Sequence, residues 1–182
     1  MVFKFLHYKK VKSTNSVAIK KIKQNVKSGV IIADNQTCGR GQFGKKWISY
    51  PGNIFLSIFF SVHNGISLKK INTLNCLIIK KAILKFIKIK ISIKKPNDLL
   101  INKKKISGIL QEIISISDNS YLIIGIGINL IKSPKIKKYP TTNLYEITNK
   151  RINKKKFEND LKEVFEKNLS KMYKINYKMN GM

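Results

Sequence analysis

The chain has 182 residues, and its 37 Lys and Arg residues against 9 Asp and Glu residues give a formal net charge of +28. This length suits one domain with a buried core. Lysines interrupt every hydrophobic stretch before it reaches the ~18 residues that span a bilayer, and the N-terminus lacks the pattern of a secretory signal peptide. Cys38 and Cys76 are too few for a disulfide framework or a sulfur-rich metal site. Secreted, membrane-spanning and zinc-ribbon classes are therefore excluded, and we expect a cytoplasmic protein without a metal site of its own.

The positive charge by itself does not identify a function. All the basic residues except Arg40 and Arg151 are lysines. Lys, Ile and Asn have A/T-rich codons, so a biased genome produces this composition without selection for a basic surface. Proteins that bind nucleic acids usually gather their charge in one patch with arginines or aromatic residues within it, whereas these lysines are scattered. We therefore expect no specific DNA binding, although non-specific attraction to polyanions stays open.

The first half of the chain predicts alternating strands and helices. Three apolar segments predict strands: residues 1–8, Val30–Ala33 and Ile54–Val62. Two segments have apolar residues at helical spacing and predict helices: Asn15–Gln24, with Ser13 or Thr14 as its N-cap, and Leu68–Lys88. Asp34–Asn53 is rich in glycine and polar residues, and we expect a loop there.

The second half predicts consecutive strands joined by short turns. The expected strands are Ile89–Ile93, Leu99–Ile101, Ile106–Ser117 and Tyr121–Leu130, followed by a helix over Lys154–Tyr173. Strands joined by such short turns pair as antiparallel neighbours. The expected fold is therefore an α+β domain, a mixed and mainly antiparallel sheet with helices packed on it.

A glycine-rich segment from Gln36 to Trp47 is the most informative stretch. Gly39, Gly41 and Gly44 allow backbone amides to approach an anion and to adopt positive φ. Arg40 lies between two of these glycines and adds a guanidinium, which suits phosphate. A Rossmann-type site is not indicated, because the segment leads into another strand rather than a helix. A plain glycine-rich hairpin is the alternative.

Two further segments carry polar groups or glycines between strands. Lys94 and Lys95 precede the turn Pro96-Asn97-Asp98, which is either a ligand-contacting turn or a hairpin with solvated charges. Gly125 and Gly127 lie within an apolar strand. Glycine weakens a strand, so this pair indicates close approach by a ligand or another backbone, with a bulge or tight packing as the alternative.

Five segments in this order resemble the catalytic domain of biotin protein ligases, from about residue 5 to the final helix. They are Ser13-Thr14-Asn15, Gln36-x-x-Gly39-Arg40-Gly41-x-x-Gly44-x-x-Trp47, Lys94-x-Pro96-Asn97-Asp98-Leu99, Lys105-x-x-Gly108-Ile109-Leu110-x-Glu112 and Gly125-x-Gly127-Ile128-Asn129. The resemblance implies the fold that this family shares with lipoate ligases and class II synthetases. It implies activation of biotin by ATP and Mg²⁺ to biotinyl-5′-adenylate, then transfer to a lysine of the biotin carboxyl carrier protein of acetyl-CoA carboxylase.

The resemblance also implies roles for individual residues. The biotin-binding residues would be Ser13, Thr14, Asn15, Gln36, Gly39, Arg40, Lys94 and Gly108. The residues that bind ATP or the adenylate would be Gly39, Arg40, Gly41, Gly44, Trp47, Lys94, Asn97, Lys105 and Asn129. Lys94 and Arg40 would be catalytic, since a carboxylate that attacks an α-phosphate needs alignment and charge neutralisation. For Trp47, core filling is the alternative to contact with adenine.

The chain departs from the family pattern in its loop and at its ends. Gln42, Phe43 and Lys45 replace most of a basic run, and Lys95 stands where relatives often have tryptophan. We expect one catalytic domain over 1–182, with no N-terminal helix-turn-helix and no C-terminal SH3-like domain. Such ligases often pair through a sheet edge, so a homodimer is open. The alternative functions are lipoate or octanoate transfer and a degenerate biotin- or nucleic-acid-binding module.

Overall fold

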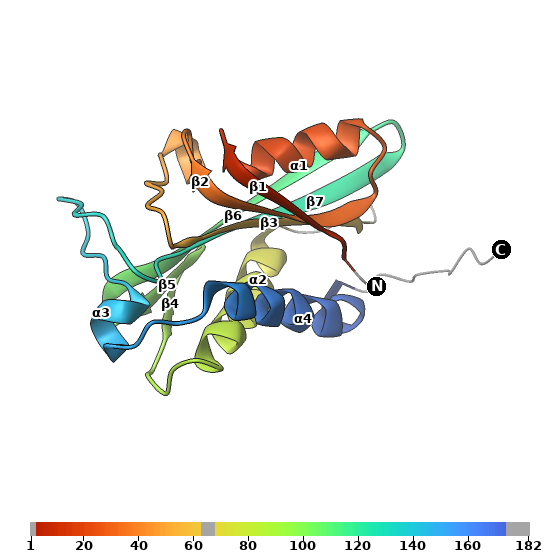
Figure 1. Cartoon of the computed structure of the whole chain (residues 1–182). Helices are drawn as coiled ribbons and strands as arrows, with labels where there is room; N and C mark the ends of the chain where they lie inside the picture. Colours follow the sequence, from red (N-terminus) through yellow and green to blue (C-terminus); the bar gives the residue numbers. More distant parts are fainter. Residues whose placement is uncertain (1–2, 63–67, 174–182) are drawn as a thin grey trace.

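The computed structural model describes residues 3–62 and 68–173 of the chain. They form a seven-stranded sheet in the order β1-β2-β3-β7-β6-β5-β4. The strands are β1 (Phe5–Val11), β2 (Ser28–Gln36), β3 (Ile54–Val62), β4 (Ser92–Lys94), β5 (Asp98–Ile101), β6 (Lys104–Ile116) and β7 (Asn119–Ile128). The helices are α1 (Thr14–Lys23), α2 (Leu68–Leu84), α3 (Leu144–Thr148) and α4 (Lys154–Tyr173). Helix α1 covers one face of the sheet, while α2 and α4 cover the other (Figure 1).

The pairing of the strands confirms the mixed, mainly antiparallel sheet. Only β1 and β2 are parallel among the described strands, and every other neighbouring pair is antiparallel. Parallel neighbours need a crossover connection, and α1 provides it between these two strands. This crossover carries α1 onto one face of the sheet and brings its first residues beside the end of β2.

Several sequence predictions needed correction at element boundaries. Strand β2 continues to Gln36, so the first residues of the expected loop are strand, and α2 ends at Leu84 rather than Lys88. The strand expected over Ile89–Ile93 is confirmed only at its end, because β4 begins at Ser92 and continues to Lys94. Ile87 and Ile91 are nevertheless buried. These apolar residues are buried in an irregular connection. An alternating apolar pattern alone does not distinguish such a connection from a strand.

The short helix α3 is an element that the sequence pattern did not predict. Asn143 caps it, since its Oδ1 accepts a hydrogen bond of 2.8 Å from the backbone N–H of Glu146. A five-residue helix has too few turns to show an apolar period. The other predicted helices and the strand at Ile54–Val62 are confirmed within a residue or two. Residues 1–2 and 63–67, which include part of the expected first strand, lie outside the described residues.

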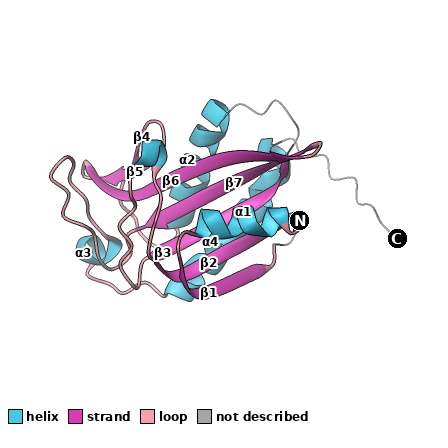
Figure 2. Cartoon of the chain, turned by 90° about the horizontal axis from the view of Figure 1, so that it is seen from above, coloured by secondary structure: helices cyan, strands magenta, loops and turns pink. Residues whose placement is uncertain are grey.

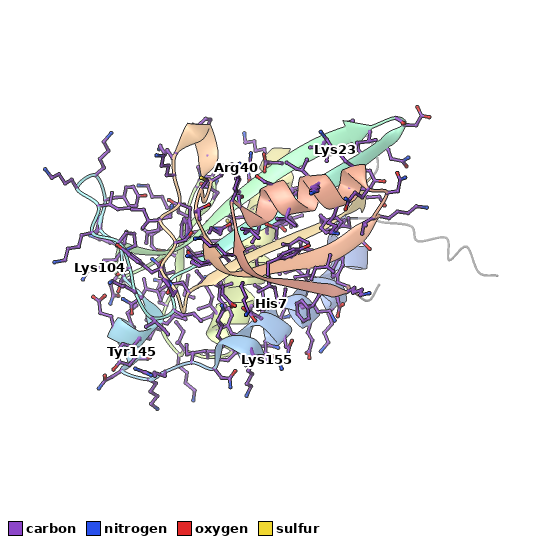
Figure 3. All side chains as sticks on the ribbon, turned by 45° about the horizontal axis from the view of Figure 1, so that its top comes forward. His7, Lys23, Arg40, Lys104, Tyr145 and Lys155 are labelled. Carbon is purple, nitrogen blue, oxygen red and sulfur yellow. The ribbon has the colours of Figure 1, made fainter. Side chains whose placement is uncertain are left out.

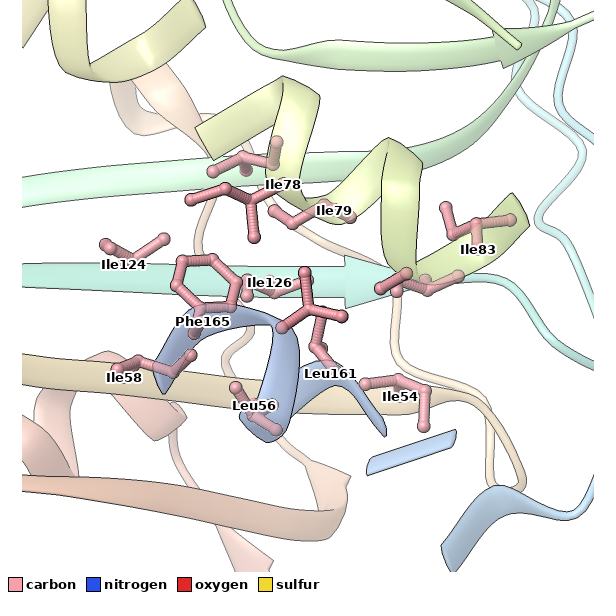
Figure 4. Packing of buried hydrophobic residues seen from close by; sticks show 14 of the residues in the cluster. Ile54, Leu56, Ile58, Ile78, Ile79, Ile83, Ile124, Ile126, Leu161 and Phe165 are labelled. Carbon is pink, nitrogen blue, oxygen red and sulfur yellow. The ribbon is translucent and has the colours of Figure 1, made fainter. Parts of the chain in front are cut away.

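The larger core lies between the sheet and helices α2 and α4. Ile54, Leu56 and Ile58 of β3 alternate toward this side and meet aliphatic side chains of α2 and the buried Leu161 and Phe165 of α4 (Figure 4). The same alternation operates in β7 through its even-numbered residues Leu122, Ile124, Ile126 and Ile128. Burial of this much apolar surface, at roughly 25 cal/mol per Å², is the dominant stabilising contribution to the domain.

The opposite face is covered only in part. Ala18 and Ile22 of α1 pack on Ile31, Phe59 and Ile123 in a smaller core. Seen from above, α1 lies over one end of the sheet, and the connecting loops gather at the other end (Figure 2). Where α1 stops, the sheet face therefore remains available for a site.

Candidate functional site

A cavity of about 350 Å³ lies on this partly covered face, between the start of α1, the glycine-rich loop and strands β4 to β7. Most of the residues singled out from the sequence line it: Ser13, Thr14, Asn15, Gln36, Arg40, Gly41, Trp47, Lys94, Asn97, Lys105 and Gly108. Gly39 and Gly44 line a neighbouring hollow, which shares Arg40, Gly41 and Trp47 with the cavity and which we call the outer hollow. Asn129 lines a small adjoining pocket together with Trp47 and Lys105.

A hydrogen-bonded network occupies the end of the cavity beside α1. The Oε1 of Gln36 accepts bonds from the backbone N–H of Thr14 at 2.8 Å and from its hydroxyl at 3.2 Å. Gln36 thus satisfies a helix-terminal N–H group from a neighbouring strand, whereas Ser13 stands at the N-cap position without a side-chain cap bond. Of the two predicted N-cap residues, Ser13 is the one at that position and Thr14 is the first helical residue, but the side chain of Ser13 does not make the expected cap bond.

Ser57 joins Thr14 and Asn15 in the same network. Its Oγ lies 2.7 Å from the Oγ1 of Thr14 and 2.5 Å from the Oδ1 of Asn15. Gln36 also donates from Nε2 to Ser49 at 3.1 Å. Ser57 is fully buried, so its hydrogen bonds fix the Asn15 amide in one orientation. These polar side chains form a rigid wall for a polar ligand group.

The strand glycines make room for side chains. A Cβ on Gly125 would lie 2.2 Å from the Oδ1 of Asn15, and one on Gly127 would lie 2.4 Å from the Cε2 of Trp47. Gly108, which pairs with Gly127 across β6 and β7, faces the same indole at 2.7 Å. The tight-packing alternative for these glycines is thus confirmed, and the close approach comes from Asn15 and Trp47.

The glycine-rich segment is a small hairpin. Gly41 N–H donates to the Lys45 carbonyl at 2.7 Å, and Trp47 N–H donates to the Gly39 carbonyl at 2.9 Å. Gly39 has to be glycine, since a Cβ there would lie 2.5 Å from the Trp47 carbonyl oxygen. Positive φ occurs at Phe43 and Gly44 at the hairpin tip. The hairpin alternative is confirmed for the loop geometry, while Arg40 still lines the cavity.

Lys94 and Asn97 flank the turn on the far side of the cavity. Lys94 ends β4 opposite Asp98 and makes no ion pair with any described residue. Asn97 is engaged with the neighbouring strand, because its Nδ2 donates to the Ile109 carbonyl at 2.6 Å and its carbonyl accepts from Ile109 N–H at 3.1 Å. The turn therefore holds Lys94 at the edge of the cavity.

Lys105 is held between two aromatic rings. Its Nζ lies 5.6 Å from the ring centroid of Trp47, 5.4 Å from that of Tyr139 and 2.7 Å from the Oδ1 of Asp98. Burial, together with the negative charge of Asp98, raises the pKa of the Tyr139 hydroxyl. These contacts fix the Lys105 ammonium in place by cation–π and ionic attraction.

Two buried polar atoms beside Lys105 have no hydrogen-bond partner among the described residues: the Nε1 of Trp47 and the Oδ1 of Asn129. The Nδ2 of Asn129 donates to the Thr142 carbonyl at 3.0 Å. One donor and one acceptor of this pocket therefore remain unpaired among the described residues. Asn129 lies one residue beyond the end of β7, because the observed strand is displaced by two residues toward the N-terminus from the expected Tyr121–Leu130.

The cavity is strongly electropositive. The described residues that line it include one acidic side chain, Asp98, which is paired with Lys105. The basic residues that line it are Arg40, Lys45, Lys46, Lys94, Lys95, Lys103 and Lys105. Cations gathered in a concave site raise the local concentration of anions. Elsewhere the charge is dispersed, as Lys23, Lys104 and Lys155 on separate parts of the surface illustrate (Figure 3).

Some residues of the site were not assigned a role from the sequence. Ser57 had a weak signal, because it is a polar residue within a strongly apolar strand. Glu112 and Gly127 stood within motifs but without a stated contact. Tyr139 had no signal, since it lies in a loop whose path only the structure reveals.

The part of the chain that the structure describes contains no cluster of three or more His, Cys, Asp or Glu side chains arranged to hold a metal ion. None of its helices is long and apolar enough to cross a membrane.

Comparison with known proteins identifies the family. Residues 8–129 match the biotin/lipoate A/B protein ligase family, and the chain belongs to it. The bifunctional ligase/repressor BirA of Bacillus subtilis is 34% identical over 135 residues, which cover 71% of this chain and 41% of that protein. BirA of Escherichia coli is 30% identical over 123 residues, 66% of this chain and 38% of that protein. The chain thus spans about two fifths of these relatives.

Solved structures share the fold. The biotin protein ligase from Aquifex aeolicus in complex with biotin and ATP is 32% identical with a TM-score of 0.77, covering 93% of this chain and 72% of that one. A lipoate protein ligase from Thermoplasma acidophilum is 11% identical with a TM-score of 0.60 over 93% of this chain and 84% of that one. The second likeness concerns the fold alone, which both branches of the family share.

Proposed function

We propose that this chain is a biotin protein ligase. A biotin carboxylate oxygen attacks the α-phosphorus of ATP, pyrophosphate leaves, and biotinyl-5′-adenylate forms. The amine of one lysine on a biotin carboxyl carrier protein then attacks the mixed anhydride, AMP leaves, and an amide bond forms. One observation carries the proposal: a single cavity combines the hydrogen-bonded network of Thr14, Gln36 and Ser57 with an excess of basic side chains. The chain also belongs to a family that includes biotin ligases.

The network suits the uncharged head group of biotin. The urea-like ring of biotin both donates and accepts hydrogen bonds, and we assign Ser13, Thr14, Asn15 and Gln36 to that ring. Gly108 also lines the cavity, beside the Trp47 indole that packs on it, and we assign it to the biotin site as well. A few convergent polar groups in an otherwise apolar pocket are typical of small-molecule sites.

The cations suit the reacting phosphate and carboxylate. We assign Lys94 and Arg40 to the reacting atoms, because Lys94 has no ion pair among the described residues and both side chains line the cavity. Positive groups aimed at developing charge in a water-poor site are the largest contribution to many enzymatic rates. Trp47, Lys105 and Asn129 are assigned to adenine, and Gly39, Gly41, Gly44 and Asn97 to the loop and turn that enclose the nucleotide.

Mg²⁺ fits this site as an ion carried by the nucleotide. Asp98, the acidic residue lining the cavity among those described, already pairs with Lys105, so the donor set suits a metal held mainly by phosphate oxygens. When bound, the ion neutralises phosphate charge. Lys94, Arg40 and Lys105 supply the protein's part of that neutralisation.

Biotin-dependent ATP–pyrophosphate exchange by the purified chain tests adenylation, with Lys94→Ala and its neighbour Lys95→Ala as a matched pair. We expect Lys94→Ala to lower exchange roughly 100-fold or more and Lys95→Ala to change it little. Equal losses would overturn the assignment of Lys94. Exchange that responds to lipoate or octanoate and not to biotin would favour the lipoate branch of the family. Biotin binding without exchange would favour a binding module.

Transfer to the carrier protein is the second step to test. The net charge of +28 favours an acidic acceptor through long-range attraction, which salt screens. Raising the ionic strength should then slow transfer of the biotinyl group and leave adenylation little changed. Equal sensitivity of both steps to salt would contradict electrostatic attraction of the acceptor.

We also propose that two copies pair through a sheet edge. Strands β1 and β4 are the edges of the sheet, and unpaired edges favour pairing with another chain. Sedimentation of the purified chain at several concentrations measures this directly, and a single species with the mass of one chain at every concentration would contradict it.

A further inference from the structure

Glu112 connects two parts of the site that the chain builds from distant segments. Its Oε2 accepts a hydrogen bond of 2.7 Å from the Nδ2 of Asn15, at the start of α1. The same oxygen pairs with the Nη2 of Arg40 on the glycine-rich hairpin. The Glu112 side chain is 26% exposed and projects from β6 on the same face as Gly108, two pleats away.

The pairing with Arg40 is selective. Glu112 is the acidic residue among the described residues that line the outer hollow, and Lys12, Lys45 and Lys46 line it too. The carboxylate nevertheless pairs with the arginine, whose planar guanidinium is shaped for carboxylates. A guanidinium has five N–H donors, so groups other than Nη2 remain for an anion inside the cavity, which Arg40 also lines.

The other contact of Glu112 is equally constrained. Asn15 donates to Glu112 with its Nδ2 and faces Ser57 with its Oδ1. Gly125 leaves no room for the amide to move toward the sheet. Glu112 therefore contacts one residue that we assign to the biotin ring and one that we assign to the reacting carboxylate and phosphate. It lies outside the inner cavity lining, so it acts through these two side chains.

We propose that Glu112 is a positioning residue, whose carboxylate holds the Arg40 guanidinium and the Asn15 amide in a fixed relation before biotin binds. The carboxylate of biotin then meets a cation that is already oriented, so less freedom is lost on binding. This inference rests on the proposed function, because it presumes that biotin is the ligand of the network.

A double-mutant cycle on biotin affinity, measured by titration calorimetry without ATP, tests the proposal. Glu112→Ala and Arg40→Ala are measured singly and together. Loss of a hydrogen bond to a charged partner is worth roughly a tenfold change or more, so we expect each single variant to weaken biotin about 10-fold. The double variant should weaken it by clearly less than the product of the two single losses, because part of the effect of Glu112 passes through Arg40 and the rest through Asn15.

Independent, multiplying losses would overturn the positioning role, and so would tighter biotin binding by Glu112→Ala, which would mean that Glu112 competes with the ligand for Arg40. Glu112→Gln keeps an acceptor oxygen and should stay within about 3-fold of the parent chain. Glu112→Met, which keeps the length of the side chain and removes both acceptor oxygens, replaces Glu112→Ala in the cycle if that variant does not fold. Glu146→Gln removes an equal charge at an exposed pair with Lys104 and should leave the affinity unchanged. Failure of the parent chain to bind biotin would contradict the proposed function itself.

Discussion

The two faces of the sheet use the same strands for different purposes. On the side of α2 and α4, β7 presents Leu122, Ile124, Ile126 and Ile128 to a continuous aliphatic core. On the side of α1, the alternate residues of the same strand are first the large Tyr121 and Ile123 and then the glycines Gly125 and Gly127. Asn15 and Trp47 fill the space above the two glycines. The cavity forms where large side chains give way to glycine, so one strand stabilises the fold and shapes the site.

The largest effect is expected on the aliphatic side. Phe165 of α4 is fully buried there, and Phe165→Ala should lower the free energy of unfolding by about 3–5 kcal/mol through lost burial and a cavity. Chemical denaturation measures it. The molecules that remain folded should bind biotin as the parent chain does. Weaker biotin binding by the folded fraction would show that the two faces are not independent.

At Gly127 we expect a loss of exchange activity, in contrast to the loss of stability expected at Phe165. The Cβ of Gly127→Ala would lie 2.4 Å from the indole of Trp47, so the ring has to move. A displacement of about 1 Å can cost 10²-fold in rate, and we expect exchange to fall by about that factor. Trp47 is the single tryptophan of the chain, so its fluorescence reports the displacement directly.

Ile126→Val, one residue away and facing the aliphatic core, is the control for Gly127→Ala. It should lower the free energy of unfolding by about 0.5–1.5 kcal/mol and leave the Trp47 fluorescence and the exchange rate unchanged. A Gly127→Ala variant with unchanged fluorescence would mean that the indole has room that these contacts do not reveal.

A smaller effect is expected from Ser57. Ser57→Ala leaves Thr14 and Asn15 without their buried hydroxyl partner, and an unsatisfied buried polar group costs about 1–3 kcal/mol. Denaturation should show this loss, and calorimetry should show weaker biotin binding. Ser61→Ala, on the same strand but outside the network of Thr14, Asn15 and Ser57, should change neither. Weaker biotin binding by both variants would indicate a general effect of altering β3.

The smallest effect is a pH dependence at Asp34, near the end of β2. Burial works to raise the pKa of Asp34, but hydrogen bonds from Lys154 and His7 outweigh it and lower that pKa. A lowered carboxyl pKa contributes stability above its ordinary value of 3.8 that is lost as the pH falls through the lowered value. Asp34→Asn should therefore melt below the parent chain at pH 7, and the difference should vanish in acid.

Glu158 provides the opposite sign for comparison. Burial raises the pKa of its carboxyl above the usual 4.5, although Lys154 and His7 act against that shift. A raised carboxyl pKa favours the folded state at low pH, and this contribution is lost as the pH rises through the raised value. Glu158→Gln should thus gain stability relative to the parent chain as the pH rises toward 7. Parallel melting curves for the two variants across this range would contradict the assignment.

Much of the site was predictable because its residues cluster in short motifs. The segments around Thr14, Gln36, Arg40, Lys94 and Lys105 were recognised from the sequence, and the structure brings them to one cavity. Prediction failed where a residue's role depends on a distant partner. The strand glycines accommodate the side chains of Asn15 and Trp47 rather than a backbone, and the hydrogen bond from Asn97 to the neighbouring strand had no signal in the sequence.

The sequence by itself determined most of the longer elements, the membership of a ligase family and the excess of positive charge, because these follow from local apolar spacing, short motifs and composition. Only the tertiary structure decided that β1 and β2 pair in parallel around α1. It also decided that the Trp47 indole lies over Gly108 and Gly127, and that Glu112 holds Arg40 from 72 positions away. Such contacts join segments far apart along the chain, and folding alone brings them within hydrogen-bonding and van der Waals distance.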